Sequence, residues 1–262
     1  MRSFDYKKSL GQNFIKDNNI ISKIVDAASI DKDTLVIEIG PGAGSLSTSI
    51  IPLSGFSILY EIDTRLENIL NDKLSSNDNY KIIFNDVLKQ NIKEDIKEYN
   101  FKKIYVVANL PYYITTPIIT KVIDEIMPDK IVIMIQNEVA DRLSAFVGTK
   151  DYGMITVLLS SRYNIKKLFK VSRNCFEPVP NVDSAVISLE KKCINNIVDM
   201  SKFEKLIKDA FQYKRKNLRN NLKGYDLNKI EDILVRNNYS LNDRAEMIPE
   251  TLFVEIANEL SR

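Results

Sequence analysis

Histidine is absent from the 262 residues of this chain, and cysteine occurs only twice. Without histidine the chain cannot contain a Ser-His-Asp triad, a histidine general base or a histidine-ligated metal. Cys175 and Cys193 cannot form a zinc site by themselves and make a poor disulfide framework. No bound metal is therefore expected, and a reducing, cytoplasmic setting is the simplest interpretation.

Long apolar runs are also missing. None approaches the roughly 18 residues that a membrane span needs, and the polar start of the sequence predicts no signal peptide. Hydrophobic content of 44% and charged content of 27% are typical of a soluble globular protein. The length predicts one large domain, or a large domain and a small one.

The net charge is only +2, which says little about partners, but the basic residues are unevenly distributed. Between positions 201 and 223, only Glu204 and Asp209 oppose a series of cations. These are Lys202, Lys205, Lys208, Lys214, Arg215, Lys216, Arg219 and Lys223. Such a run forms either a solvated helix face or a surface that binds phosphates, and a second cluster (Arg2, Lys7, Lys8, Lys16) favours the latter.

Apolar runs rich in Ile and Val alternate with helix-like segments through most of the chain. They lie at 34–40, 57–61, 81–86, 104–109 and 131–135. Continuous apolar runs are typical of parallel strands covered on both faces. The spacing therefore predicts an α/β fold with a doubly wound sheet, whose ligands bind at the carboxyl ends of the strands.

The later part of the chain has a different pattern. Runs at 155–159 and 184–189 are interpreted as a hairpin that completes the sheet. Beyond Lys191 the β-branched runs stop and amphipathic segments follow, at about 200–223, 226–237 and 249–261. We therefore expect a catalytic domain at 1–193 and a small helical domain at 194–262.

A glycine-rich turn follows the first predicted strand. In Glu38–Gly44, glycine occurs at every second position from residue 40, as Gly40, Gly42 and Gly44. This spacing differs from the G-x-G-x-x-G that cradles a pyrophosphate, and no Lys-Ser/Thr pair marks a P-loop. Glycines here permit a tight turn and a close approach of a ligand to the backbone.

Carboxylates end the next two predicted strands. Glu61 is placed to accept from ribose hydroxyls, and Asp86, with the Val87 N–H beside it, is placed to bind an adenine ring. These are the polar requirements of an adenosyl ligand that has no phosphate. Each carboxylate taken singly could instead cap a helix.

The segment Asn109-Leu110-Pro111-Tyr112 ends the fourth predicted strand at the same sheet edge. The Asn109 side-chain oxygen and the Leu110 carbonyl can accept hydrogens from an exocyclic amine, and Pro111 stiffens the loop. Tyr112 offers a ring on which a base can stack. Catalysis would then depend on orientation rather than on a strong base, which agrees with a chain that lacks histidine. In isolation, the segment is equally well explained as a strand-ending turn.

A flipped base needs a second aromatic ring, and Phe176 is the candidate. It lies in a proline-flanked loop before the last predicted strand. The alternative is that Phe176 packs in the core, which is the commoner fate of a single phenylalanine.

Together these motifs resemble the KsgA-type ribosomal RNA adenine N6,N6-dimethyltransferases, to which the erythromycin-resistance methyltransferases are related. The resemblance covers nearly the whole chain. It rests on segments 8–14, 37–47, 109–117, 136–143, 150–153, 176–189 and 215–222.

The resemblance implies a class I methyltransferase fold with a mostly parallel seven-stranded sheet, and S-adenosylmethionine as cofactor. Gln12, Asn13 and the Ile15 backbone would cover the methionine end of the cofactor. The Gly40 turn, Gly42, Glu61, Asp86, Val87 and Asn109 would hold the rest.

The implied reaction is dimethylation of two adjacent adenosines in a hairpin loop near the 3′ end of small-subunit rRNA. The implied substrate is the assembling small subunit, and a monomer is expected. The helical domain would help to select the site, with a basic helix at 214–223 gripping phosphates through Lys214, Arg215, Lys216 and Arg219.

Two alternatives remain. One is an enzyme with the same chemistry that acts on large-subunit rRNA, and the other is a non-catalytic RNA-binding or assembly factor. Leu110, Leu10-Gly11 and the segment 177–184 favour the small-subunit group. Asn137 and Asn181 depart from it, because lysine is expected at both positions.

Overall fold

The computed structural model describes residues 13–193 and 197–262. The chain forms two compact units, Met1–Ala140 with Lys166–Lys191, and Asp141–Ile165 with Lys192–Arg262. The predicted boundary after 193 lies close to the change of unit between Lys191 and Lys192. The prediction missed the segment 141–165, which belongs with the C-terminal helices. No helix of the described part is long and apolar enough to cross a membrane.

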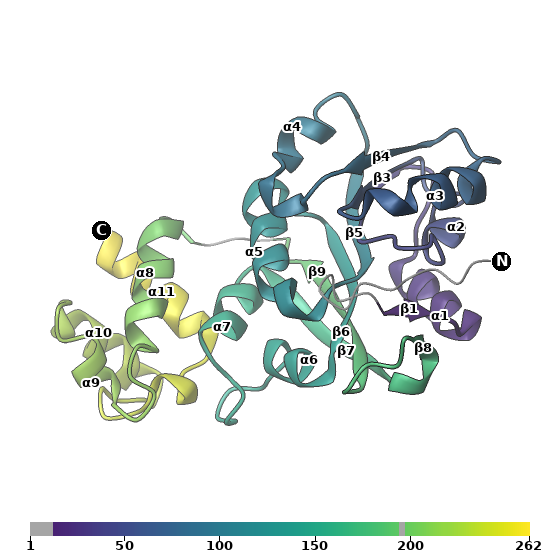
Figure 1. Cartoon of the computed structure of the whole chain (residues 1–262). Helices are drawn as coiled ribbons and strands as arrows, with labels where there is room; N and C mark the ends of the chain where they lie inside the picture. Colours follow the sequence, from purple (N-terminus) through teal and green to yellow (C-terminus); the bar gives the residue numbers. More distant parts are fainter. Residues whose placement is uncertain (1–12, 194–196) are drawn as a thin grey trace. The chain divides into compact units, whose positions relative to one another are not determined.

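The first unit is built on a seven-stranded sheet of order β4-β3-β2-β5-β6-β9-β7 (Figure 1). Its strands are β2 (Thr34–Ile39), β3 (Phe56–Glu61), β4 (Tyr80–Phe84), β5 (Lys103–Asn109), β6 (Lys130–Gln136), β7 (Tyr163–Val171) and β9 (Ser184–Lys191). β2 through β6 pair in parallel, and β9 is antiparallel to β6. The predicted α/β class and the mostly parallel sheet are confirmed.

Helices lie on both sides of this sheet, as Figure 1 shows for α1 and α5. The helices of the unit are α1 (Asn18–Ala28), α2 (Ser47–Ile50), α3 (Glu67–Leu74), α4 (Ile92–Ile96) and α5 (Thr115–Ile126), and α6 (Asn137–Leu143) begins in it. Ile24 of α1 packs with Val36, Val107 and Val132 in one buried cluster. A short second sheet pairs β1 (Phe14–Ile15) with β8 (Phe176–Glu177), so the start of the described chain is tied to the loop before β9.

The predicted strand at 155–159 is wrong, because these residues lie in helix α7 (Met154–Ser160). A short, mostly apolar run fits a buried helix as well as a strand. The strand that the prediction omitted is β7. Its sequence contains outward-facing lysines and therefore lacks the continuous apolar run of a buried strand. Lysines of this kind are typical of the edge of a sheet, where β7 lies.

The second unit is helical, with α7, α8 (Met200–Ala210), α9 (Leu218–Asn221), α10 (Leu227–Arg236) and α11 (Glu250–Ser261). Phe203, Leu206, Ile233 and Phe253 belong to its core. The predicted helices near 226–237 and 249–261 are confirmed. A continuous helix at 200–223 is wrong, because α8 ends at Ala210 and turns separate it from α9.

Candidate active site

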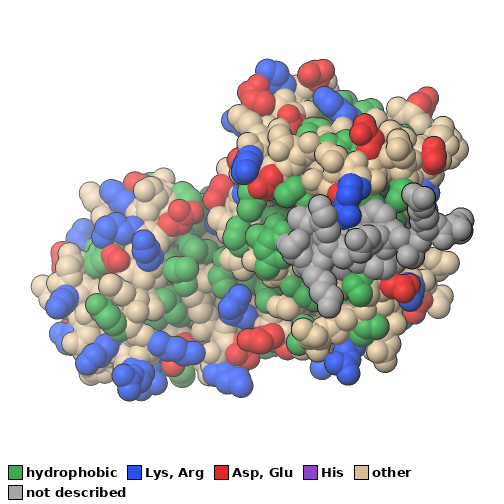
Figure 2. Space-filling view, in the orientation of Figure 1, with side chains coloured by type: hydrophobic (Ala, Val, Ile, Leu, Met, Phe, Trp, Pro, Cys, Tyr) green, Lys and Arg blue, Asp and Glu red, His purple; other side chains and the backbone are tan. Residues whose placement is uncertain are grey.

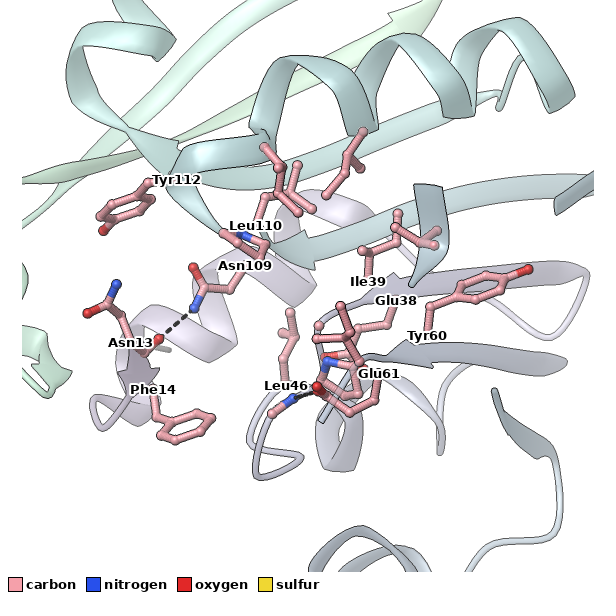
Figure 3. A pocket seen from close by; sticks show the side chains of 18 of the residues that line it. Asn13, Phe14, Glu38, Ile39, Leu46, Tyr60, Glu61, Asn109, Leu110 and Tyr112 are labelled. Atoms are coloured by element: carbon pink, nitrogen blue, oxygen red, sulfur yellow. Dashed lines mark hydrogen bonds between the residues drawn. The ribbon is translucent and has the colours of Figure 1, made fainter. Parts of the chain in front are cut away.

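A pocket lies in the first unit at the carboxyl ends of β2, β3, β4 and β5 (Figure 3). It gathers most of the residues predicted for the cofactor and for catalysis. They are Asn13, Ile15, Gly40, Gly42, Glu61, Asp86, Val87, Asn109, Leu110, Pro111 and Tyr112. The parallel sheet explains this convergence, since each segment leaves the same edge. Gln12 lies outside the described residues.

The glycine turn forms one wall of the pocket. Gly40, Gly42 and Gly44 have φ of 72°, 57° and 74°, in the left-handed region that favours glycine. A Cβ on Gly42 would lie 2.3 Å from a ring carbon of Phe14. Phe14 is itself a pocket residue that sequence reasoning did not single out, because its contact with the turn is made across the fold.

Glu61 holds this turn. One carboxylate oxygen accepts a hydrogen bond from the Gly42 N–H at 2.9 Å, and the other accepts from the Asp63 N–H at 2.9 Å. The side chain is 4% exposed, and its burial raises its pKa above the ordinary value. A carboxylate has about four acceptor sites, so Glu61 can still accept a hydrogen bond from a ligand hydroxyl.

Glu38 also lines the pocket, although the sequence analysis did not name it as a site residue. It is 1% exposed and accepts a hydrogen bond from the Ser47 hydroxyl at 2.6 Å. Burial, with a smaller contribution from the Glu61 charge, raises the pKa of Glu38 to about 8. Its position two residues before Gly40, at the end of the first predicted strand, could have identified Glu38 as a site residue.

Asp86 both lines the pocket and caps a helix. One oxygen accepts from the Leu88 N–H at 3.0 Å, at the start of the single-turn helix η3 (Val87–Lys89). The capping alternative is therefore correct for one side-chain oxygen. It does not exclude the binding role, because Asp86 and Val87 both belong to the pocket lining.

The Asn109 amide has a fixed orientation. Its Nδ2 atom donates to the backbone carbonyl of Asn13 at 2.9 Å. A carbonyl can only accept, so the nitrogen must face Asn13 and the oxygen Oδ1 must lie on the opposite side of the amide. Figure 3 shows this arrangement, with Oδ1 directed away from Asn13.

The rest of the loop is held as firmly. The Leu110 N–H donates to the carbonyl of Met134 on β6 at 3.1 Å, and the Thr115 hydroxyl donates to the Pro111 carbonyl at 3.0 Å. Among the described residues, no hydrogen bond to the Leu110 carbonyl is present. The segment is therefore a strand-ending turn, as the alternative interpretation held. It also leaves the Leu110 carbonyl available as a hydrogen-bond acceptor.

Tyr112 begins the single-turn helix η4 (Tyr112–Ile114) and is half-buried. Its hydroxyl lies 2.6 Å from the Ser184 hydroxyl on β9, which fixes the ring at its far end. Burial raises the pKa of Tyr112, so the phenol stays protonated near neutral pH. The ring is thus a neutral, anchored surface.

Phe176 requires a correction. Its side chain is 1% exposed and belongs to the core with Ile15, Ile21 and Val186, and it is not among the pocket residues. The loop position suggested exposure, but pairing of β8 with β1 turns the ring inward. Tyr113, which sequence reasoning overlooked, lines the pocket and is 57% exposed.

The predicted RNA-binding residues lie in the second unit. Lys214, Arg215 and Lys216 are exposed in the turns between α8 and α9, not on a helix. The Asn221 amide donates to the carbonyl of Ala210, the last residue of α8, at 2.7 Å. Among the described residues none of these three cations forms an ion pair, whereas Arg219 lies 3.1 Å from Glu231. Figure 2 shows more Lys and Arg than Asp and Glu side chains on the visible face of this helical part.

The pocket lining contains no cationic side chain among the described residues. Three acidic side chains (Glu38, Glu61, Asp86) line it together with apolar and amide side chains, and the raised pKa of about 8 leaves Glu38 largely uncharged near neutral pH. Such a lining suits an uncharged or cationic ligand and disfavours a phosphate. No group of three or more Cys, Asp or Glu in the described ranges could hold a metal ion.

Comparison with known proteins identifies the family. The model of the family described as "Ribosomal RNA adenine dimethylase" matches residues 3–262. The chain belongs to this family.

Among its curated relatives is "Ribosomal RNA small subunit methyltransferase A" of Staphylococcus aureus, 44% identical over 85% of this chain and 76% of that protein. A solved "dimethyladenosine transferase from Plasmodium falciparum" is 25% identical, covers 93% of this chain and 95% of that one, and gives a TM-score of 0.78. The fold is also that of "23S rRNA methyltransferase ErmE" (24% identity, 95% of this chain and 100% of that one, TM-score 0.76). The resemblance inferred from the motifs is thus confirmed for the adenine dimethylase family.

Proposed function

We propose that this protein transfers methyl groups from S-adenosylmethionine to N6 of two adjacent adenosines, in a hairpin loop near the 3′ end of small-subunit rRNA. The observation that carries the proposal is the fixed amide of Asn109 in a pocket lined by acidic and apolar groups: its Nδ2 is bonded to Asn13, and its Oδ1 is directed away from Asn13 (Figure 3). The small-subunit target is supported by the 44% identity to a protein named for that subunit.

The residues of the pocket fit S-adenosylmethionine. Glu61 would accept from the ribose hydroxyls, Asp86 from the adenine amine, and the Val87 N–H would donate to the adenine ring. Asn13 and the Ile15 backbone would face the methionine end. A lining with acidic side chains and no cationic one among the described residues suits a ligand that carries a sulfonium and an ammonium but no phosphate.

When bound, the cofactor supplies an electrophilic methyl group on a positively charged sulfur. The role of the protein is to orient the nucleophile. Adenine N6 is a poor nucleophile because its lone pair is delocalised into the ring. Asn109 Oδ1 and the Leu110 carbonyl would each accept one N6 hydrogen, which favours a pyramidal nitrogen with its lone pair directed at the methyl carbon.

Tyr112 would stack on the extruded adenine. Its hydroxyl is held by Ser184, so the ring is oriented before RNA arrives. Unpaired loop adenines suit this site, because a base outside a duplex costs least to extrude. No general base is required while N6 is aligned in this way, since the proton can leave to water after transfer.

The RNA would be gripped by the exposed cations Lys214, Arg215 and Lys216. We propose that the substrate is the assembling small subunit in the cytoplasm and that the protein acts as a monomer. An enzyme acting on large-subunit rRNA and a non-catalytic assembly factor are the two competing functions.

One experiment separates the three. The purified protein is incubated with labelled S-adenosylmethionine and either undermethylated small subunits or large-subunit rRNA, and the product is mapped. The proposal predicts dimethyladenosine in the small-subunit loop. Label confined to large-subunit rRNA would reject the proposed target, and label on neither RNA would reject both enzymatic functions.

A further inference from the structure

A second recess lies in the first unit, beyond the end of β6 and against the loop between β8 and β9. It is lined by Gln136, Asn137, Glu138, Arg173, Asn181, Val182 and Asp183. None of these residues belongs to the pocket that contains Asn109. The lining is polar except for Val182, and two of its members are the asparagines at positions where lysine was expected.

The recess is connected to Tyr112 through the sheet. Gln136 on β6 lies directly opposite Ser184 on β9 in the antiparallel ladder. Opposed residues of such a pair project from the same face, with Cβ atoms roughly 4.5–5.5 Å apart. Since the Ser184 hydroxyl contacts the Tyr112 hydroxyl, Gln136 lies one side chain beyond the edge of the stacking ring.

The walls of the recess are held in place by internal hydrogen bonds. Asn137 Oδ1 accepts from Lys167 Nζ at 2.8 Å, and Asp183 Oδ1 accepts from the Arg173 N–H at 3.0 Å. Gln136 differs, because its half-buried side-chain amide makes no hydrogen bond to any described residue. The amide offers donors and an acceptor to a ligand in the recess.

The charge of the lining discriminates between parts of a nucleotide. Arg173 is the cation of the set, and Glu138 and Asp183 oppose it. A phosphate would therefore meet two carboxylates, whereas a neutral base would not. A glutamine amide pairs with adenine in a bidentate manner, donating to N7 and accepting from N6.

We propose that this recess binds the base of the nucleotide next to the target adenine, and that Gln136 selects adenine there. This inference rests on the proposed function. It places one of the two adjacent adenosines at Asn109 and Tyr112 while its neighbour occupies the recess. Gln136 would then be a specificity residue for the RNA sequence, without a role in the transfer itself.

The test uses the full chain, S-adenosylmethionine and hairpin RNAs whose loop carries either the adenosine pair or a pair with one member replaced by uridine. Both single replacements are made. For the wild type, kcat/KM should fall by about 5- to 150-fold for at least one of them, the range that one bidentate base contact provides. For Gln136→Ala, kcat/KM on the adenosine pair should fall and the ratio between the RNAs should shrink to within about twofold.

Two controls separate recognition from damage to the fold. Gln90→Ala makes the same change at another half-buried glutamine that lines neither pocket, and should retain the wild-type ratio. Gln136→Met keeps the length of the side chain without its amide, and should behave as Gln136→Ala does.

A wild type that methylates all three RNAs equally, or a Gln136→Ala variant that keeps the full ratio, would overturn the inference and leave the proposed function intact. A wild type that methylates none of them would overturn the proposed function as well.

Discussion

The side-chain amide of Asn109 donates to the backbone carbonyl of Asn13 at 2.9 Å, across 96 residues of sequence. This hydrogen bond joins the loop that would hold the target amine to the segment that would cover the cofactor. It fixes which end of the amide faces the pocket before either ligand is present. The site is therefore preorganised at the atom on which the proposed chemistry depends.

Tyr112 and Ser184 provide a test of the stacking role. Tyr112→Ala should weaken RNA binding by about 1–3 kcal/mol, the contribution of one base on an aromatic ring. Tyr112→Phe and Ser184→Ala should each have a smaller effect on RNA binding, because the ring remains. Filter binding with a loop RNA measures these changes. If Tyr112→Phe weakened binding as much as Tyr112→Ala, the hydroxyl rather than the ring surface would make the contact.

Gly42 should not tolerate a side chain. In Gly42→Ala the left-handed φ of 57° would cost about 1–3 kcal/mol, and the added Cβ would displace the Phe14 ring. We expect a lower melting temperature and a weaker affinity for S-adenosylmethionine by calorimetry. Gly224→Ala is the matched control, since an added Cβ there meets no atom within 4 Å. Equal losses in the two variants would contradict the assigned role of the turn.

Glu38 predicts a specific pH dependence of stability. Its pKa rises from 4.5 to about 8 on folding, so in this range the folded state binds more protons than the unfolded state. Its contribution to stability therefore falls as pH rises from 4.5 to about 8. Glu38→Gln removes this contribution.

Chemical denaturation of both proteins between pH 5 and 8 measures the effect. The variant should gain stability relative to the wild type as pH rises. A difference that does not change with pH would mean that the Glu38 carboxyl has the same pKa in both states.

Lys214, Arg215 and Lys216 are expected to bind phosphates. Replacing all three with alanine should make the dependence of log K on log salt shallower by about 2–3, from the counterions that three phosphate contacts release. The triple variant Lys202→Ala, Lys205→Ala, Lys229→Ala is the control, because each of its lysines lies within 4 Å of a carboxylate. An unchanged salt slope in the first variant would remove these residues from the RNA-binding surface.

Much of this arrangement was predictable because it follows from local pattern. The buried strands that end near Gly40, Glu61 and Asn109 appear as apolar runs, and the rule for parallel sheets brings their ends together. Where a pattern was ambiguous, the prediction was wrong. The run at 155–159 is apolar in a way that fits either a strand or a helix, and packing in the second unit decides for the helix.

Contacts made across the fold were not predictable. Phe176 is buried because β8 pairs with β1, and no local signal indicates that pairing. The ring of Phe14 over Gly42 is a contact of the same kind. Helix α8 ends at Ala210, before the cluster Lys214–Lys216, and the Asn221 amide donates to the Ala210 carbonyl. Charge periodicity does not reveal this interaction. The resemblance to a family did supply Asn13, which the residue pattern alone would not have.

The measurement that tests the central claim most directly compares wild type and Asn109→Ala for two quantities, the rate of methyl transfer in a single turnover and the calorimetric affinity for S-adenosylmethionine. Removing the group that orients N6 should lower the rate by roughly 10²–10³ or more, as loss of one preorganised polar group does in other enzymes. The affinity should stay within about tenfold of wild type. Loss of all cofactor binding, or transfer at the wild-type rate, would contradict the account.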